Sequence, residues 1–304
     1  MLWSNRLYTL QPRALFFFCC LLIPAILLLG ACSKDRLHSG DSGSKNALIE
    51  IVHDGAKRQA IFHPARDSYA PLVLVMHGYG GNASDMQHWT KLDSIADLHG
   101  WAVAYPQGLE DERGMPHWNA NLDWTDVDDV GFLDTLVSHL SGHHGIDESN
   151  VFACGFSNGG FMSYSLACAR PEGYRAIGSV AGTMSPEDAA SCPPSAAVPV
   201  VQFSGLADQT IPYSGEIDFP QFAGAPGMET VMATWAERHG LLDSATEQLS
   251  GFHPGWGEVV LHQYIALEDA PSPVQWYTFE NGPHTWFERT SENLVAFFKS
   301  HRMQ

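Results

Sequence analysis

The chain has 304 residues, of which 45% are hydrophobic and 16% are charged, and its formal net charge is −18. This composition is typical of a globular protein with a buried core, and it excludes a disordered chain. Because the chain is acidic and has no basic stripe that would neutralise phosphates, we do not expect it to bind nucleic acid.

The N-terminus has the pattern of an export signal. Arg6 and Arg13 precede an apolar run that ends in L-G-A-C at Cys32. A basic start, an apolar middle and small residues at the cut predict a signal peptide over residues 1–31. The L-G-A-C ending resembles the bacterial lipoprotein signal, which implies that a lipid is attached to the thiol of Cys32. In such lipoproteins, a serine directly after the lipidated cysteine, here Ser33, implies that the protein is located in the outer membrane. Plain secretion and a retained membrane helix are the alternatives, although the apolar run is short for a membrane span.

A polar segment separates this signal from the rest of the chain. Residues 33–46 are rich in Gly, Ser and charged side chains, so a flexible tether is predicted over residues 32–46. One folded domain is predicted over residues 47–304. Its first feature is a β-hairpin, because two strand-like segments flank the turn sequence Asp54-Gly55.

Beyond the hairpin, apolar segments of strand length alternate with segments that have helical spacing. Strands that are apolar throughout and alternate with helices predict an α/β fold, in which a mostly parallel sheet is covered by helices on both faces. The predicted strands are 71–76, 101–108, 150–157, 174–182, 198–205 and 274–280, and the predicted helices are 85–99, 130–145, 159–170, 228–239 and 291–301.

Three of the six cysteines follow Cys32 in the sequence: Cys154, Cys168 and Cys192. An exported protein can form disulfides, and three thiols allow one bridge and one free cysteine. Cys154 lies in a predicted buried strand and is interpreted as a small core residue. Cys168 and Cys192 are therefore the candidate disulfide pair. No C-x-x-C spacing typical of a metal site is present.

The strongest local motif is G-F-S-N-G, residues 155–159, between the apolar strand residues 150–154 and the following helix. Small residues on both sides of Ser157 permit the sharp turn that raises a nucleophilic hydroxyl above the carboxyl edge of the sheet. The N-terminus of the next helix adds N–H donors and a partial positive charge. We therefore predict that Ser157 is a catalytic nucleophile.

A nucleophilic serine needs donors for the oxyanion that it creates. The sequence H-G-Y-G-G, residues 77–81, follows the strand 71–76, and its glycines allow the backbone to approach a substrate closely. We predict the backbone N–H groups of Tyr79 and Asn158 as oxyanion donors, with Gly80 as a substitute for Tyr79. His77 precedes the nucleophile in the chain and is interpreted as a structural residue.

The acid and base of a triad are predicted from the ends of two later strands. Asp208 follows the strand 198–205, and His284 lies in the turn between the last strand and the last helix. The carboxyl ends of parallel strands meet at one edge of the sheet, where functional residues collect. The chain order Ser157, Asp208, His284 is that of the α/β-hydrolases.

The motifs HGYGG, AYPQG, Trp118-Asn119, DDVGF, GFSNGG, VAGTM, SGLADQTIPY and GPHTW occur in this order along the chain. Together they resemble a known family, the extracellular polyhydroxybutyrate depolymerase and feruloyl esterase group. The resemblance covers almost all of the chain after the tether, and it implies an α/β-hydrolase fold with Ser157, Asp208 and His284 as the triad. His117 stands where the group commonly has a cysteine, and Phe287 stands where it usually has a proline.

We therefore predict a secreted serine carboxylic-ester hydrolase that acts on feruloyl or acetyl esters of polysaccharides, or on hydroxyalkanoate esters. A peptidase or amidase on the same fold and an inactive surface-binding lipoprotein are the alternatives. Trp118, Tyr213 and Trp286 are predicted to contact the substrate, because aromatic faces can hold an aromatic acyl group, a sugar ring or a polyester chain. No metal or organic cofactor is expected, and only the lipid anchor is expected to contact the membrane.

Overall fold

The computed structural model describes residues 46–304 except 123–124, 216–217, 220–221 and 267–269. The chain divides into two units, residues 1–41 and 42–304. The predicted signal peptide, the predicted lipidation site Cys32 and the tether up to residue 45 lie outside the described residues. In the described part of the chain, none of the helices combines the length and the hydrophobicity needed to cross a bilayer.

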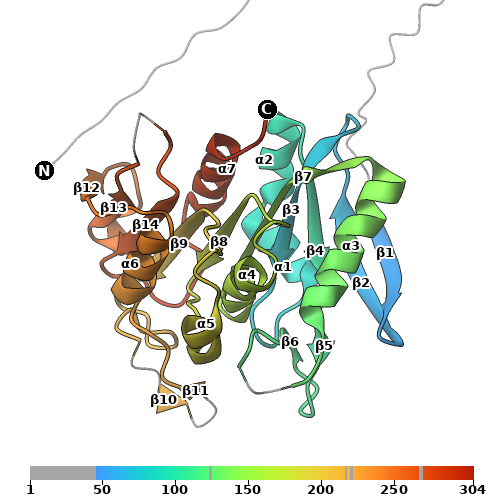
Figure 1. Ribbon diagram of the computed structural model, residues 1–304, viewed down its shortest axis with the longest axis horizontal. Helices are drawn as coiled ribbons and strands as arrows, with labels where there is room; N and C mark the ends of the chain where they lie inside the picture. Colours follow the sequence, from blue (N-terminus) through green and yellow to red (C-terminus); the bar gives the residue numbers. More distant parts are fainter. Residues whose placement is uncertain (1–45, 123–124, 216–217, 220–221, 267–269) are drawn as a thin grey trace, which may run out of the picture. The chain divides into compact units, whose positions relative to one another are not determined.

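A ten-stranded sheet forms the core of the second unit (Figure 1), with the strand order β1-β2-β4-β3-β7-β8-β9-β14-β13-β12. In this order, each pair of neighbours from β4 to β14 is parallel. The pairs β1–β2 and β2–β4 at one end of the sheet, and β14–β13 and β13–β12 at the other end, are antiparallel. The strands are β1 (Ala47–His53), β2 (Ala56–His63), β3 (Ala70–Met76), β4 (Ala102–Pro106), β7 (Ile146–Phe156), β8 (Ala176–Val180), β9 (Val200–Gly205), β12 (Ser244–Leu249), β13 (Val259–Tyr264) and β14 (Val274–Phe279).

Helices cover both faces of this sheet, which explains why the central strands are apolar throughout. Side chains alternate along a strand, so Leu72 and Leu74 of β3 face one core while Val73 and Val75 face the other. The first core is closed by α3 (Asp129–His144), α4 (Asn158–Ala169) and α6 (Met228–Arg238), and the second by α1 (Ala83–Thr90), α2 (Leu92–His99) and α7 (Thr290–Ser300).

The predicted hairpin is confirmed. β1 and β2 pair around Asp54 and Gly55, whose φ values are 48° and 76°. Two consecutive residues in the left-handed region form the turn whose twist matches that of the flanking strands. The predicted central strands and the mostly parallel sheet are confirmed as well.

Two parts of the fold differ from the prediction. The predicted helix over 85–99 is divided into α1 and α2 at Lys91, whose φ of 54° ends the first helix. The sheet also continues beyond β14 into β13 and β12, which the sequence pattern did not indicate. The side chains of β12 are largely exposed, so this edge strand has no apolar alternation that would predict it.

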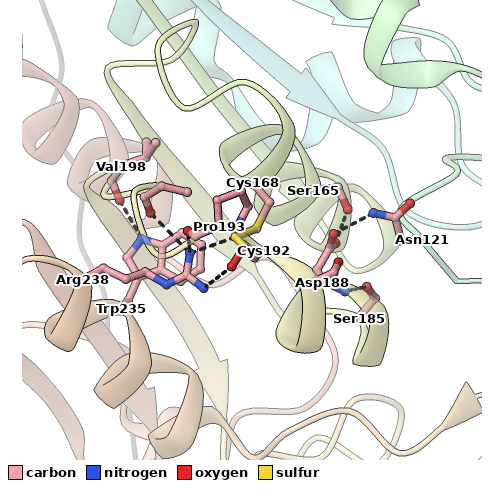
Figure 2. The surroundings of a disulfide bond; sticks show 12 residues. Asn121, Ser165, Cys168, Ser185, Asp188, Cys192, Pro193, Val198, Trp235 and Arg238 are labelled. Carbon is pink, nitrogen blue, oxygen red and sulfur yellow. Dashed lines mark hydrogen bonds between the residues drawn. A yellow bond between two sulfur atoms is a disulfide. The ribbon is translucent and has the colours of Figure 1, made fainter.

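A disulfide joins Cys168, near the end of α4, to Cys192, which follows α5 (Pro186–Ser191) (Figure 2). Arg238 donates a hydrogen bond to the sulfur of Cys192 at 2.8 Å. The buried carboxylate of Asp188 in α5 accepts hydrogen bonds from Ser165 of α4 and from Asn121. The helix that begins beside Ser157 is therefore tied to α5 by one covalent and one hydrogen-bonded link.

A buried ion pair holds the DDVGF segment. Arg58 of β2 donates to Asp129 at 2.6 Å, both side chains are almost completely buried, and the guanidinium lies over the ring of Phe132. The second oxygen of Asp129 accepts from the backbone N–H of Asn119. The motif thereby ties the sheet, the start of α3 and the loop that contains Trp118 into one rigid support.

Candidate active site

Ser157 lies in a sharp turn between β7 and α4. Its φ and ψ are 52° and −118°, a conformation that L-residues adopt only where the surrounding structure holds them. The turn requires glycine on both sides. A Cβ on Gly155 would lie 2.3 Å from the carbonyl of Gly159, and a Cβ on Gly159 would lie 2.3 Å from the carbonyl oxygen of Met76. The predicted turn motif is thus explained by direct backbone contact.

The structure brings the three predicted triad residues together. The Nε2 atom of His284 lies 2.9 Å from Oγ of Ser157, and its Nδ1 atom lies 2.8 Å from Oδ2 of Asp208. With the Nδ1 proton donated to Asp208, the Nε2 lone pair of a neutral His284 faces the serine hydroxyl. This arrangement can remove a proton from Ser157 as the hydroxyl attacks a carbonyl carbon.

The carboxylate of Asp208 is buried and fixed in orientation. Its side chain is 1% exposed, and its second oxygen accepts the backbone N–H groups of Thr210 and Ile211 at 2.8 and 2.9 Å. β9 and β14 pair in parallel, so the loops that follow them are neighbours. A Cβ on Gly205 would lie 2.0 Å from the carbonyl oxygen of Gly282, and this close approach brings Asp208 beside His284.

The loop after β3 lies directly beside the nucleophile. A Cβ on Gly78 would lie 3.3 Å from Cβ of Ser157, so any side chain here would crowd the nucleophile. His77 anchors the loop, since its Nδ1 donates to the carbonyl of Gly78 and its Nε2 accepts the N–H of Gly108. Burial lowers the pKa of His77 to about 4, so the ring is neutral at neutral pH. Its position agrees with the structural role predicted from the sequence.

Gly80 does not serve as the substitute oxyanion donor that we predicted. Its backbone N–H donates to the carbonyl of Pro116 at 2.8 Å and is therefore already used. Tyr79 and Asn158 flank the nucleophile from the two sides expected of oxyanion donors, one in the loop after β3 and one at the start of α4. Their roles as donors remain predictions.

The side chain of Asn158 is hydrogen-bonded to the backbone of Trp118, which the sequence did not indicate. The Asn158 side chain accepts the backbone N–H of Trp118 at 2.7 Å and donates to its carbonyl at 3.0 Å. The Trp118 indole donates to the carbonyl of His77. The predicted substrate contact by Trp118 is wrong, because the side chain is completely buried. Trp118 instead fixes the two backbone segments that flank Ser157.

The other two predicted substrate contacts occupy different positions. The hydroxyl of Tyr213 accepts from the indole of Trp276 and donates to Glu229, and burial raises the pKa of Tyr213 to about 12. Trp286 is 7% exposed, and its indole donates to Ser291. Contact of either residue with a substrate remains a prediction.

Sequence reasoning missed one aromatic residue next to the triad. Trp89, at the end of α1, is 44% exposed, and its ring meets the edge of Phe156 with centroids 4.8 Å apart. Phe156 in turn lies 4.8 Å from the ring of His284. The signal that could have identified Trp89 is a bulky aromatic side chain on the polar face of a short helix.

A group of possible metal ligands lies away from the triad. His53, Asp54 and Asp128 present ligand atoms within 4.8 Å of one another at the β1–β2 turn and the start of α3. Both carboxylates are exposed, and His53 already contacts Asp128 at 3.0 Å. This arrangement is typical of a surface ion pair, and we assign it no part in the chemistry of Ser157.

A mostly parallel sheet with helices on both faces, a serine in a strained strand-to-helix turn, and an acid and a base on later loops define an α/β-hydrolase. The chain matches the family described as Phospholipase/Carboxylesterase over residues 57–225, which is more than half of its length, and it belongs to this family. It is a serine esterase, as predicted from the sequence.

Relatives of the chain support this assignment. It is 30% identical to a putative esterase, NocK, from Nocardia uniformis, over 78% of this chain and 73% of the relative. It is 31% identical to a probable feruloyl esterase C from Aspergillus niger, over 66% and 75% of the two chains. These similarities confirm the predicted resemblance to the feruloyl esterase group.

Among solved structures, the chain resembles the acetyl xylan esterase from Aspergillus awamori with a TM-score of 0.60. The alignment covers 84% of this chain and 99% of that chain, at 16% identity. At this identity the likeness shows the fold, and it confirms the predicted α/β-hydrolase architecture.

Proposed function

We propose that the chain is an exported carboxylic-ester hydrolase that acts through an acyl-enzyme on Ser157. The observation that carries the proposal is the continuous relay from Ser157 through His284 to the buried Asp208, with distances of 2.9 and 2.8 Å. Feruloyl and acetyl esters of polysaccharides, or hydroxyalkanoate esters, are the substrates that we propose.

In the first half of the reaction, Oγ of Ser157 bonds to the carbonyl carbon while His284 takes the hydroxyl proton. Asp208 holds the imidazole and stabilises its positive charge. The backbone N–H groups of Tyr79 and Asn158 receive the oxyanion, and each such donor contributes about 100- to 1,000-fold in rate. The bond to the alcohol oxygen then breaks as His284 returns the proton to that oxygen. Water releases the acid by the same steps.

Pre-steady-state kinetics with a p-nitrophenyl ester tests the acyl-enzyme. We expect a burst of one nitrophenol per chain, followed by a slower steady rate set by hydrolysis of the acyl-Ser157. The Ser157→Ala variant should show neither phase, whereas Ser244→Ala, on the exposed edge strand β12, serves as the control that keeps both. Normal turnover by Ser157→Ala would refute the mechanism.

A panel of soluble esters then identifies the acid. Methyl ferulate, acetylated xylo-oligosaccharides and hydroxybutyrate oligomers, each assayed at several concentrations, give kcat/KM values that compare the proposed acyl groups directly. If the matching p-nitroanilide is hydrolysed faster than the p-nitrophenyl ester, the esterase proposal is replaced by an amidase.

We further propose that residues 1–31 form a lipoprotein signal peptide, that residues 32–46 are a tether and that residues 47–304 are the catalytic domain. The supporting pattern is the apolar run that ends in L-G-A-C at Cys32. Cells that express the full chain should incorporate labelled fatty acid into it, and Cys32→Ser should abolish the label. Equal labelling of the variant would contradict lipidation at Cys32, and with it the proposed anchoring in an outer membrane.

A further inference from the structure

The loop that contains the expected oxyanion donor Tyr79 is short of side chains that could hold it in place. Residues 78–81 are Gly-Tyr-Gly-Gly and are called the glycine loop below. Gly80 has a φ of 72°, and glycines allow the backbone many other conformations as well. An oxyanion donor must be fixed in position before the reaction begins. Contacts from outside the glycine loop therefore have to position the backbone N–H group of Tyr79.

A short β-hairpin supplies such contacts. It is formed by β5 (Leu109–Glu110) and β6 (Pro116–His117), and it follows β4, the parallel neighbour of β3 (Figure 1). The carbonyl of Pro116 accepts the backbone N–H of Gly80 at 2.8 Å. The side chain of Met115 covers the same glycine, since a Cβ on Gly80 would lie 2.5 Å from its methyl carbon. The hairpin therefore packs directly against the glycine loop.

The side chain of Tyr79 forms a further link to this hairpin. Its hydroxyl donates to Oδ2 of Asp111, in the turn between β5 and β6, at 2.6 Å. A hydrogen bond to an ionised carboxylate is roughly twice as strong as one between neutral groups. The other oxygen of Asp111 accepts the backbone N–H groups of Arg113 and Met115 at 2.8 and 2.9 Å. The carboxylate is thereby fixed to the backbone of the turn, so it is an anchor for Tyr79 that does not move with the glycine loop.

The two partners of this bond are a protonated hydroxyl and an ionised carboxylate. The bond lowers the pKa of Asp111, and it raises the pKa of Tyr79. Both side chains are accessible to water, which competes for the same hydrogen bonds, so the bond contributes little to the stability of the domain. Its main effect is to restrict the positions that Tyr79 can take, and Tyr79 is the one residue of the glycine loop that has a side chain.

We propose that Asp111 is a positioning residue of this esterase, which holds the hydroxyl of Tyr79 so that the backbone N–H of Tyr79 points at the oxyanion. The inference rests on the proposed function, in which Tyr79 is an oxyanion donor. Asp111 does not contact the substrate and acts only through Tyr79. Loss of the bond therefore slows the chemical step and leaves both substrate binding and folding largely intact.

The Tyr79→Phe variant tests this role, because it removes the bond and keeps the aromatic ring, the backbone and the carboxylate. We expect kcat to fall by about ten-fold, less than the loss on removal of a whole donor, with KM and Tm close to those of the wild type. Asp111→Ala should lower kcat as well. The double variant should lose no more than Asp111→Ala alone, because both changes remove the same bond.

Two further variants complete the set. Asp111→Asn should restore most of the activity, because the amide oxygen can accept the N–H groups of the turn while the amide nitrogen donates to the hydroxyl of Tyr79. Glu112→Ala is the matched control. It removes an exposed carboxylate from the same turn, and it should keep the wild-type kcat. A loss in Glu112→Ala equal to that in Asp111→Ala would refute the specific role of Asp111.

A sulfur substitution in the substrate shows whether the loss concerns the oxyanion. In a thionoester, sulfur replaces the carbonyl oxygen, and sulfur is a weak hydrogen-bond acceptor, so well-placed donors favour the ordinary ester. The ratio of kcat/KM for p-nitrophenyl acetate to that for its thiono analogue should fall by about five-fold in Tyr79→Phe and in Asp111→Ala. General damage to the fold lowers both values together. An unchanged ratio, or additive losses in the double variant, would refute the positioning role.

The Ser157→Ala variant separates this inference from the proposed function. If Ser157→Ala is inactive while Tyr79→Phe keeps the wild-type kcat and ratio, the acyl-enzyme mechanism stands and the role of Asp111 is refuted. If Ser157→Ala hydrolyses p-nitrophenyl acetate at the wild-type rate, the acyl-enzyme mechanism is refuted, and the role of Asp111 is refuted with it.

Discussion

Removal of the disulfide should destabilise the domain by an amount that follows from its position in the chain. Cys168 and Cys192 are separated by 24 residues in the sequence. Closing a loop of this length lowers the entropy of the unfolded chain by roughly 12 cal/mol/K, which corresponds to about 3.4 kcal/mol at 25 °C. For a domain of this size, that free energy lowers Tm by roughly 7–14 °C. Loss of the hydrogen bond from Arg238 to the sulfur of Cys192 acts in the same direction.

The assay is differential scanning calorimetry of the wild type and of the Cys168→Ala/Cys192→Ala variant, with and without dithiothreitol. The reductant should lower the Tm of the wild type to that of the variant and leave the variant unchanged. Cys154→Ala is the control, because Cys154 is a buried free thiol that this chemistry does not involve. A difference below about 1 kcal/mol, or equal sensitivity of both proteins to the reductant, would refute the reasoning.

Three further predictions concern the site. Asp208→Asn should lower kcat by about 10⁴-fold while the circular dichroism spectrum is preserved, and a loss below ten-fold would contradict the orienting role of the carboxylate. Gly155→Ala should reduce the free energy of unfolding sharply in urea titrations, because its Cβ would lie 2.3 Å from Gly159, whereas Gly142→Ala, with open space around it, should be neutral or stabilising. Burial lowers the pKa of His77 from 6.5 to about 4, so as the pH falls His77 is protonated in the unfolded chain before it is protonated in the folded chain. This difference in pKa contributes to the free energy of unfolding fully above about pH 6.5. The contribution, about 3 kcal/mol in total, is lost as the pH falls toward 4. Denaturation of His77→Gln at pH 7 and pH 4.5 should show a smaller loss than the wild type, and an identical loss would show that His77 does not contribute.

The central strands could be predicted because strands that are buried on both faces are apolar throughout, as β3 is. Edge strands lack this pattern. β12 exposes most of its side chains, and its pairing with β13 depends on contacts that are distant in the sequence. The break between α1 and α2 at Lys91 could not be predicted from the sequence either, since a helix end in the left-handed conformation is usually formed by glycine or asparagine and not by lysine.

The positions of the three triad residues could be predicted because each follows a strand whose carboxyl end lies at the same edge of the sheet. The direction in which the neighbouring aromatic side chains point could not be predicted from the sequence. Trp118, which was predicted to contact the substrate, is completely buried against His77, whereas Trp89 belongs to a helix and is exposed beside Phe156. A loop position predicted near a site does not determine whether a large side chain is buried in the scaffold or exposed.

Labelling with a fluorophosphonate tests the central claim most directly, because this reagent reacts much faster with an activated serine hydroxyl than with an ordinary one. Intact mass spectrometry of the wild type should show one adduct per chain, and peptide mapping should assign it to Ser157. Ester turnover should fall in proportion to the labelled fraction, and Ser157→Ala should remain unlabelled. An adduct on another residue, or full ester turnover in a chain labelled at Ser157, would contradict the account.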